Sequence, residues 1–179
     1  MTFVITWTGR KLVLDAPKKE DISIVDIARG VANECRYGNQ CHFYSVAEHS
    51  VLLSRYFSTL RNPGRLPLLA LLHDASEAYL GDVPSVRKEG LSAYLSTEQS
   101  LQAAILDALE VDPPTDRESA LVKDADLRIR LDERDVIAPR IEYLGSPELL
   151  TPLGVRIYKW LPSRAEEEFL TLFSMLTGL

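Results

Sequence analysis

Residues 66–82 read Leu-Pro-Leu-Leu-Ala-Leu-Leu-His-Asp-Ala-Ser-Glu-Ala-Tyr-Leu-Gly-Asp. An apolar run leads directly into a histidine and an aspartate, and residues 67–80 are predicted to form one buried helix that ends at Gly81. Ionisable groups at the end of an apolar helix are costly to bury without a partner. A divalent cation is the strongest partner that a histidine and a carboxylate can share, so we expect a functional site at His73-Asp74.

The length and composition of the chain favour one globular domain over residues 1–179. The chain has 179 residues, 46% of them hydrophobic, which is enough for one substantial core. A net charge of -6 lacks the basic character that binding to polymeric nucleic acid usually needs, so we expect no such partner. No apolar stretch approaches the ~20 residues of a membrane span and the N-terminus has no basic leader, so we expect a cytoplasmic protein with no membrane partner.

The pattern along the chain predicts an all-α fold, a single helical bundle with a small N-terminal β-hairpin. The hairpin occupies about residues 1–15, with β-prone runs at 2–7 and 11–14, and the helical core about residues 20–175. Four Ser or Thr residues followed three positions later by Glu or Asp indicate helix starts. The predicted helices are 23–32, 45–60, 67–80, 91–109, 115–138 and one from Ser163 to the C-terminus. The apolar stripe of the last helix fits either the core or the face of a homo-oligomer.

The three histidines, His42, His49 and His73, are unevenly placed. His49 and His73 fall on successive helices joined by a short loop, and such helices pack as an antiparallel pair that could bring two imidazoles together. A third helix adds Asp126. The set His49, His73, Asp74 and Asp126 would suit Mn, Fe, Co or Zn. For His49 taken alone, a hydrogen-bonded core histidine is the commoner role.

Two further carboxylates follow the His-Asp pair, and each has two readings. Glu77 lies four residues after His73. It would either serve the site, by assisting a ligand or acting as a general acid or base, or be a surface carboxylate at the helix end. Asp82 follows Gly81, so it either belongs to the site or caps the turn before Pro84. Both alternatives stay open at the level of sequence.

The two cysteines do not indicate a disulfide framework or a structural zinc site. Cys35 and Cys41 lie six residues apart without a CxxC spacing, and we expect reduced thiols. A thiolate metal site with the neighbouring His42 is disfavoured. The pattern assigns no role to these three residues.

Four short motifs occur in a fixed order: Ala-Glu-His-Ser at 47–50, His-Asp-Ala-Ser-Glu at 73–77, Gly-Asp-Val-Pro at 81–84 and Val-Lys-Asp-Ala-Asp at 122–126. Together they resemble the signature of HD-domain phosphohydrolases, most closely the bacterial 5'-deoxynucleotidases and the short phage dATP triphosphohydrolases. The resemblance implies one divalent transition metal, Co, Mn, Zn or Fe, with Mg an option for a triphosphate substrate. By position, its ligands would be His49, His73, Asp74 and Asp126.

The resemblance also implies roles around the metal. Glu77 would activate or position the attacking water, and Asp82 would face the sugar or transfer a proton. Arg36-Tyr37 stands where such enzymes place an arginine and an aromatic residue near the substrate, and Arg36 could pair with phosphate through its planar fork. The aromatic residue is a tryptophan in the related enzymes considered, so Tyr37 leaves base and sugar selectivity open.

Two lysines are candidates for binding phosphate. Lys123 lies one turn before Asp126 on the same helix face, whereas a solvent-exposed position is the default reading of Lys88. The expected function is hydrolysis of a small deoxynucleotide at its 5' position, with dATP giving deoxyadenosine and triphosphate as the leading reaction. The alternatives are a 5'-deoxynucleotidase for monophosphates, a phosphodiesterase for cyclic or signalling nucleotides, and a non-catalytic domain that binds a nucleotide and signals.

Overall fold

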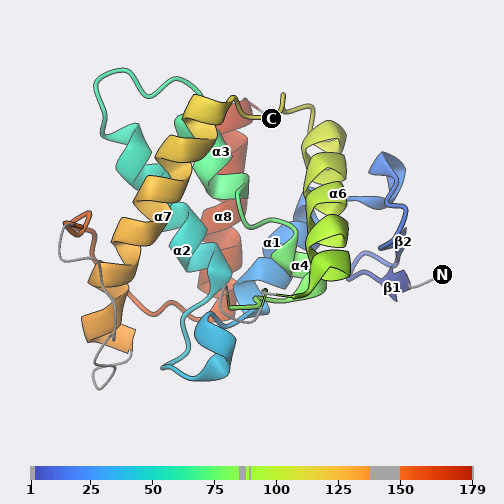
Figure 1. Cartoon of the computed structure of the whole chain (residues 1–179), viewed down its shortest axis with the longest axis horizontal. Coiled ribbons are helices and arrows are strands. Elements are labelled where there is room, and N and C mark those ends of the chain that lie inside the picture. Colours follow the sequence, from blue (N-terminus) through green and yellow to red (C-terminus); the bar gives the residue numbers. More distant parts are fainter. Residues whose placement is uncertain (1–2, 85–87, 89, 138–149, 179) are drawn as a thin grey trace.

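The computed structural model describes residues 3–84, 88, 90–137 and 150–178 (Figure 1). It confirms the predicted fold class, because the described chain is mostly helical and begins with a small antiparallel hairpin. In the hairpin, Val4 pairs with Leu12. The elements are β1 (Phe3–Ile5), β2 (Lys11–Val13), η1 (Lys19–Asp21), α1 (Ile24–Asn33), η2 (Tyr37–Asn39), α2 (Val46–Ser58), α3 (Leu66–Leu72), α4 (Glu77–Leu80), α6 (Ser92–Ala108), α7 (Asp116–Ile137) and α8 (Pro162–Thr177).

Most predicted helix ends agree with these bounds to within about two residues. Thr2, the start of the first predicted strand, and Ala138, the end of the predicted helix 115–138, lie outside the described residues. The assignment of 1–179 to a single domain stays a prediction. Within the described part of the chain, no helix is both long and apolar enough to cross a bilayer.

The core lies where α2 packs on α3 and where α8 packs on α1, α2 and α3 (Figure 1). Phe169 and Phe173 of α8 are buried, and Leu170 and Leu176 pack partly buried against the same core. The apolar stripe of the C-terminal helix therefore serves the core, the first of the two roles that its sequence left open. Its helix begins at Pro162 rather than Ser163, and Leu161 at the N-cap makes no side-chain capping bond.

The prediction of one helix over residues 67–80 is wrong. The helix stops at Leu72 and resumes as α4 at Glu77, so His73 and Asp74 lie in a break between two short helices. The reason is a side chain from α6. Gln102 accepts a hydrogen bond from the Ser76 N–H at 3.1 Å and donates one to the Leu72 carbonyl at 2.7 Å, and these are the two groups that a continuous helix would join to each other.

The second short helix, α4, lies directly against α1 because of a glycine. A Cβ atom on Gly30 would come within 2.6 Å of the Ala78 carbonyl oxygen, so any larger residue would push α4 away. Gly81 then ends α4, as predicted, with a φ of 77° that favours glycine. These two glycines fix the position of Glu77 at the start of α4.

The sequence predicts a capping box most clearly at α2 and α7, and the hydrogen bonds of the two boxes differ. At α7 the box is complete, since Glu118 N–H donates to Thr115 and the Glu118 carboxylate accepts from the Thr115 N–H. At α2 only half of it forms: Ser45 accepts from the Glu48 N–H at 3.1 Å, but the carboxylate of Glu48 turns elsewhere. It accepts three backbone N–H groups, from Tyr158 at 2.7 Å, Lys159 at 2.9 Å and Trp160 at 2.6 Å.

Replacing Glu48 with glutamine should therefore destabilise the protein. The two N–H groups of Tyr158 and Lys159 share one carboxylate oxygen, while Trp160 alone uses the other. A glutamine amide offers one acceptor, so one part-buried donor loses its hydrogen bond to a charged group, at a cost of about 1–3 kcal/mol. Urea denaturation of both proteins measures this difference. The exposed Glu167→Gln is the matched control, and an equal effect of the two substitutions would contradict the assignment.

Candidate metal centre

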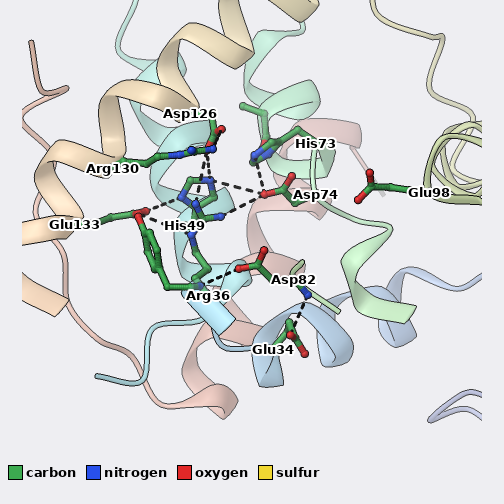
Figure 2. Close-up of polar contacts among 12 residues, drawn as sticks. Glu34, Arg36, His49, His73, Asp74, Asp82, Glu98, Asp126, Arg130 and Glu133 are labelled. Atoms are coloured by element: carbon green, nitrogen blue, oxygen red, sulfur yellow. Dashed lines mark hydrogen bonds and ion pairs between the residues drawn. The ribbon is translucent and has the colours of Figure 1, made fainter. Parts of the chain in front are cut away.

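Three elements bring the predicted ligands to one place. His49 comes from α2, His73 and Asp74 from the break after α3, and Asp126 from α7 (Figure 2). The imidazole centroids of His49 and His73 are 5.3 Å apart, as expected for an antiparallel helix pair. One ligand atom from each of His49, His73 and Asp74 lies within 4.8 Å of the other two. This spacing is suited to three ligands of a single ion.

Hydrogen bonds orient both imidazole rings. Nδ1 of His73 donates to the Ala70 carbonyl at 2.7 Å, and Nδ1 of His49 donates to the Glu133 carboxylate at 2.7 Å, since these oxygens can only accept. When the rings are neutral, as metal binding requires, the Nε2 atom of each ring carries the lone pair. Within the described residues both Nε2 atoms are buried and have no hydrogen-bond partner. A hydrogen bond from Nδ1 to a carboxylate, as in His49, or to a backbone carbonyl, as in His73, is the usual arrangement of metal-binding histidines. This donor set fits a divalent ion.

Asp126 lies at the edge of this cluster. Its Oδ1 is 3.2 Å from Nε2 of His49, while its Oδ2 accepts a hydrogen bond from Arg130 at 2.7 Å. Arg130 was not among the predicted site residues, although its position four residues after Asp126 places it on the same face of α7. One oxygen of Asp126 therefore faces the histidines and the other is held by a cation.

Arg36 is buried against the carboxylates of the cluster rather than facing solvent. Its guanidinium nitrogens lie 3.4 Å from Asp74, 3.7 Å from Asp126 and 3.8 Å from Glu133 (Figure 2). Burial alone would raise the pKa values of Asp74 and Asp126, but the neighbouring histidines and Arg36 hold both pKa values well below the ordinary range. Both carboxylates are therefore ionised at neutral pH. The role of Arg36 in binding phosphate stays a prediction.

Tyr37 and Asp82 are tied to each other and to the cluster. The Tyr37 N–H donates to Oδ2 of Asp82 at 3.0 Å, and the Tyr37 hydroxyl donates to Glu133. The side chain of Asp82 is thus bonded to the Arg36-Tyr37 loop and holds it beside the site. The Asp82 N–H in turn donates to the carboxylate of Glu34 at 3.0 Å. Catalytic roles for Asp82 and Tyr37 stay predictions.

A polar cavity of about 270 Å³ opens beside the cluster. Arg130 lines this cavity. So do residues that were predicted from the sequence to belong to the site, namely Arg36, Tyr37, Asp74, Glu77, Asp82, Lys88 and Asp126. Lys88 is half-buried and its ammonium group lies 2.6 Å from Glu98 of α6, so the default reading of a solvent-exposed lysine is wrong. The structure therefore brings these predicted residues, drawn from five separate segments, around one cavity.

A second cavity of about 320 Å³ lies on the other side of His73 and Asp126. Its walls are more apolar, with Leu69, Leu106 and Val122, and Lys123 stands at its border. Lys123 and Asp126 therefore share a cavity, as their spacing along the helix predicts. Asp126 also lines the cavity formed by Arg36 and Lys88, so the two cavities meet at this residue.

Comparison with known proteins agrees with this centre. The profile of the HD domain matches residues 39–127, which include His49, His73, Asp74 and Asp126. An uncharacterized protein of Escherichia coli strain K12, YfdR, is 38% identical over 135 residues, which are 75% of this chain and 71% of that protein. The chain belongs to the HD-domain family. An uncharacterized protein of Rhodobacter capsulatus, RCAP_rcc00048, is 42% identical over 105 residues, 55% of this chain and 53% of that protein.

HD domains are generally metal-dependent hydrolases, and the cluster of His49, His73 and Asp74 fits that chemistry. In this HD domain the two cysteines are free thiols, as expected, with their sulfur atoms 3.9 Å apart. His42 is exposed and lies outside the cluster. Besides Arg130, the sequence analysis also missed Glu133, which is fully buried behind His49.

Glu77 is a buried carboxyl group of this HD domain that faces the polar cavity and has a strongly raised pKa. Burial, and then the negative charges of Asp74 and Asp82, raise the pKa of Glu77 to about 10. In the metal-free protein Glu77 is therefore protonated at neutral pH. A neutral carboxyl group can donate a proton as well as accept one, which suits either of the roles expected for Glu77 in water activation.

The pKa of Glu77 predicts how pH affects the stability of the metal-free HD domain. An unfolded glutamate loses its proton near pH 4.3, whereas folded Glu77 keeps it up to about pH 10. The folded state then binds more protons than the unfolded state, so its free energy of unfolding falls as pH rises between these values. Glu77→Gln cannot ionise and should lack this loss.

The measurement is thermal denaturation in the presence of a chelator at pH 6 and at pH 9. Glu77→Gln should gain stability relative to the wild type on going from the lower to the higher pH. Parallel pH dependence of the two proteins would mean that Glu77 ionises as in an unfolded chain.

Proposed function

We propose that this HD domain hydrolyses the 5' phosphoester bond of deoxynucleotides, with dATP as the leading substrate. The observation that carries the proposal is the convergence of His49, His73 and Asp74 beside a polar cavity lined by Arg36 and Glu77. Two buried imidazole lone pairs and an ionised carboxylate suit a divalent ion, and the cavity beside them is large enough for a phosphoryl group and a sugar. Water would add to the phosphorus, the bond to O5' would break, and O5' would take up a proton.

The metal would be held by His49, His73 and Asp74, with Asp126 as the fourth ligand. When bound, a Co, Mn, Zn or Fe ion, or Mg with a triphosphate, would make a coordinated water more acidic and neutralise charge on the phosphoryl oxygens. Because no serine nucleophile or phosphate-binding P-loop motif occurs in the sequence, we propose direct attack by water without a covalent intermediate.

The remaining residues would act on the substrate and its protons. Glu77 stands at the start of α4 and faces the cavity, where it would position the water and exchange a proton with it. Arg36 would turn one edge of its guanidinium from the carboxylates to the phosphate oxygens. Asp82 holds the Tyr37 backbone and would place the aromatic ring against the sugar. Lys88 and Lys123 would bind the outer phosphates from two sides.

One observation favours the monophosphate reading as a second candidate. Lys88 is paired with Glu98, Arg130 with Asp126, and Arg36 with Asp74. Cations that are already paired offer less charge to the polyphosphate of dATP than to a single phosphate. A 5'-deoxynucleotidase would need only Arg36 and the metal to neutralise its substrate.

The deciding experiment incubates the purified protein with Co²⁺, Mn²⁺, Zn²⁺ or Mg²⁺ and with dATP, the other dNTPs or the dNMPs separately. Inorganic triphosphate from dATP, identified by ³¹P NMR, is the expected result. Orthophosphate from dNMPs together with intact dATP would establish the nucleotidase instead. Binding of metal and nucleotide without hydrolysis would favour the signalling domain. Cyclic nucleotides and guanosine polyphosphates complete the panel, and hydrolysis of these alone would overturn the proposal.

A further inference from the structure

The break between α3 and α4 depends on one residue that no motif includes. In a continuous helix the Ser76 N–H would donate to the Leu72 carbonyl. In this structure the side-chain amide of Gln102 occupies that gap, accepting from Ser76 N–H at 3.1 Å and donating to the Leu72 oxygen at 2.7 Å. Figure 1 shows α6, which carries Gln102, beside the connection between α3 and α4. The chain passes this point in a tighter turn, with Ala75 N–H donating to Leu72 at 3.1 Å.

Only an amide side chain of this length can make both bonds. A carboxylate accepts but does not donate, and an amine donates but does not accept. The orientation of the amide is fixed as well, because the oxygen must face the N–H group and the nitrogen must face the carbonyl. Gln102 is thus a specific replacement for one helical hydrogen bond, made by a side chain 26 positions away from Ser76.

The break between α3 and α4 contains the two adjacent predicted metal ligands, His73 and Asp74. On a continuous helix, neighbouring side chains point about 100° apart. In the break, Oδ2 of Asp74 lies 3.0 Å from Nε2 of His73 and 3.9 Å from Nε2 of His49. Nδ1 of His73 also donates a hydrogen bond to the Ala70 carbonyl. In a continuous helix that carbonyl would accept from the Asp74 N–H. The convergence of the pair and the interruption of the helix are therefore one feature.

We propose that Gln102 is a positioning residue for the metal centre, which holds the helix open so that His73 and Asp74 face the same point as His49. The proposal rests on the metal site of the proposed function but not on its reaction. Gln102 itself lies outside the ligand set. Its effect passes through Leu72 and Ser76 to His73 and Asp74, which lie between them.

Gln102→Met tests this, because methionine has a similar length and lacks both polar groups. Once Gln102 is gone, the Ser76 N–H and the Leu72 carbonyl can bond to each other, so the helix closes while the fold is kept. We expect the melting temperature of the metal-free protein to change little and the affinity for Mn²⁺ to fall about 10- to 100-fold, as for other residues that orient metal ligands. Gln102→Asn, which keeps an amide but is too short to span the gap, should show the same loss.

The experiment titrates Mn²⁺ into each variant by calorimetry and records the visible absorption spectrum of the Co²⁺-loaded protein, which reports ligand geometry. Gln99→Met, an exposed residue one turn earlier on α6, is the matched control and should behave as the wild type. Wild-type affinity and spectrum in both Gln102 variants would overturn the proposal, as would a lower melting temperature with unchanged affinity. Neither readout uses a nucleotide, so a wild-type protein that binds metal but hydrolyses nothing would contradict the proposed function alone.

Discussion

Replacing Asp74 with asparagine should strongly weaken metal binding at the centre and reduce nucleotide hydrolysis with it. Asp74 supplies the only carboxylate of the compact cluster with His49 and His73 among the described residues. Its ionised form is favoured by both histidines and by Arg36, so at neutral pH the site already holds a negative charge for the ion. A neutral amide removes that charge. Because residues that merely orient a ligand change affinity 10- to 100-fold, loss of the ligand itself should reduce Mn²⁺ affinity by about 100-fold or more.

The measurement is a calorimetric titration of Mn²⁺ together with the hydrolysis assay. Asp124→Asn is the matched control, since Asp124 lies on α7 near the site but is exposed and pairs with Arg128 rather than with a residue of the cluster. This variant should bind and hydrolyse as the wild type does. Undiminished Mn²⁺ binding by Asp74→Asn would place the metal elsewhere in the molecule.

The pairing of His49 with His73 could be predicted because it depends on local features. A capping box starts α2, a short loop follows it, and an apolar run forms α3, so an antiparallel pair is the simplest packing. The ordered motifs then supplied Asp126 from α7. These residues lie together in the structure for the reasons that their spacing indicates.

Glu133 was missed although the sequence holds a signal for it. Asp126, Arg130 and Glu133 are spaced by four and then three residues, which places them on one face of a helix. The surrounding charges, in the segment 128–135, look like a solvated surface. What distinguishes Glu133 is burial behind His49, and burial depends on how α7 packs against α2.

The helix break could not be predicted, because periodicity describes only the segment in which it is read. Residues 66–80 have the pattern of one helix, and their interruption comes from Gln102 on another helix. The same holds for Glu48, whose spacing predicts a bond to Ser45 but whose carboxylate binds the segment 158–160. In both cases a distant polar group competes successfully with a local hydrogen bond.

Glu133→Ala should be the most destabilising of the substitutions considered, because Glu133 is fully buried among three polar partners. Its carboxylate accepts from Nδ1 of His49 and from the Tyr37 hydroxyl, and lies 3.8 Å from Nε of Arg36. Burial by itself would raise the pKa of Glu133, but Arg36 and His49 lower this pKa to about 2. Removing one partner of a buried charged network costs about 3–5 kcal/mol. Urea denaturation of the metal-free protein measures this loss, with the exposed Glu167→Ala as the control, expected to change stability by less than about 1 kcal/mol.

Glu133→Gln separates the charge from the shape of the side chain. The glutamine oxygen can still accept from Nδ1 of His49 and keep Nε2 directed at the centre, but Arg36 loses a neighbouring negative charge. Stability should therefore fall less than in Glu133→Ala, and Mn²⁺ affinity should follow the same order, because only the alanine variant frees the His49 ring to rotate. Equal Mn²⁺ affinities in the wild type and in Glu133→Ala would show that packing alone orients His49, and that the carboxylate behind it serves the stability of the fold and not the metal.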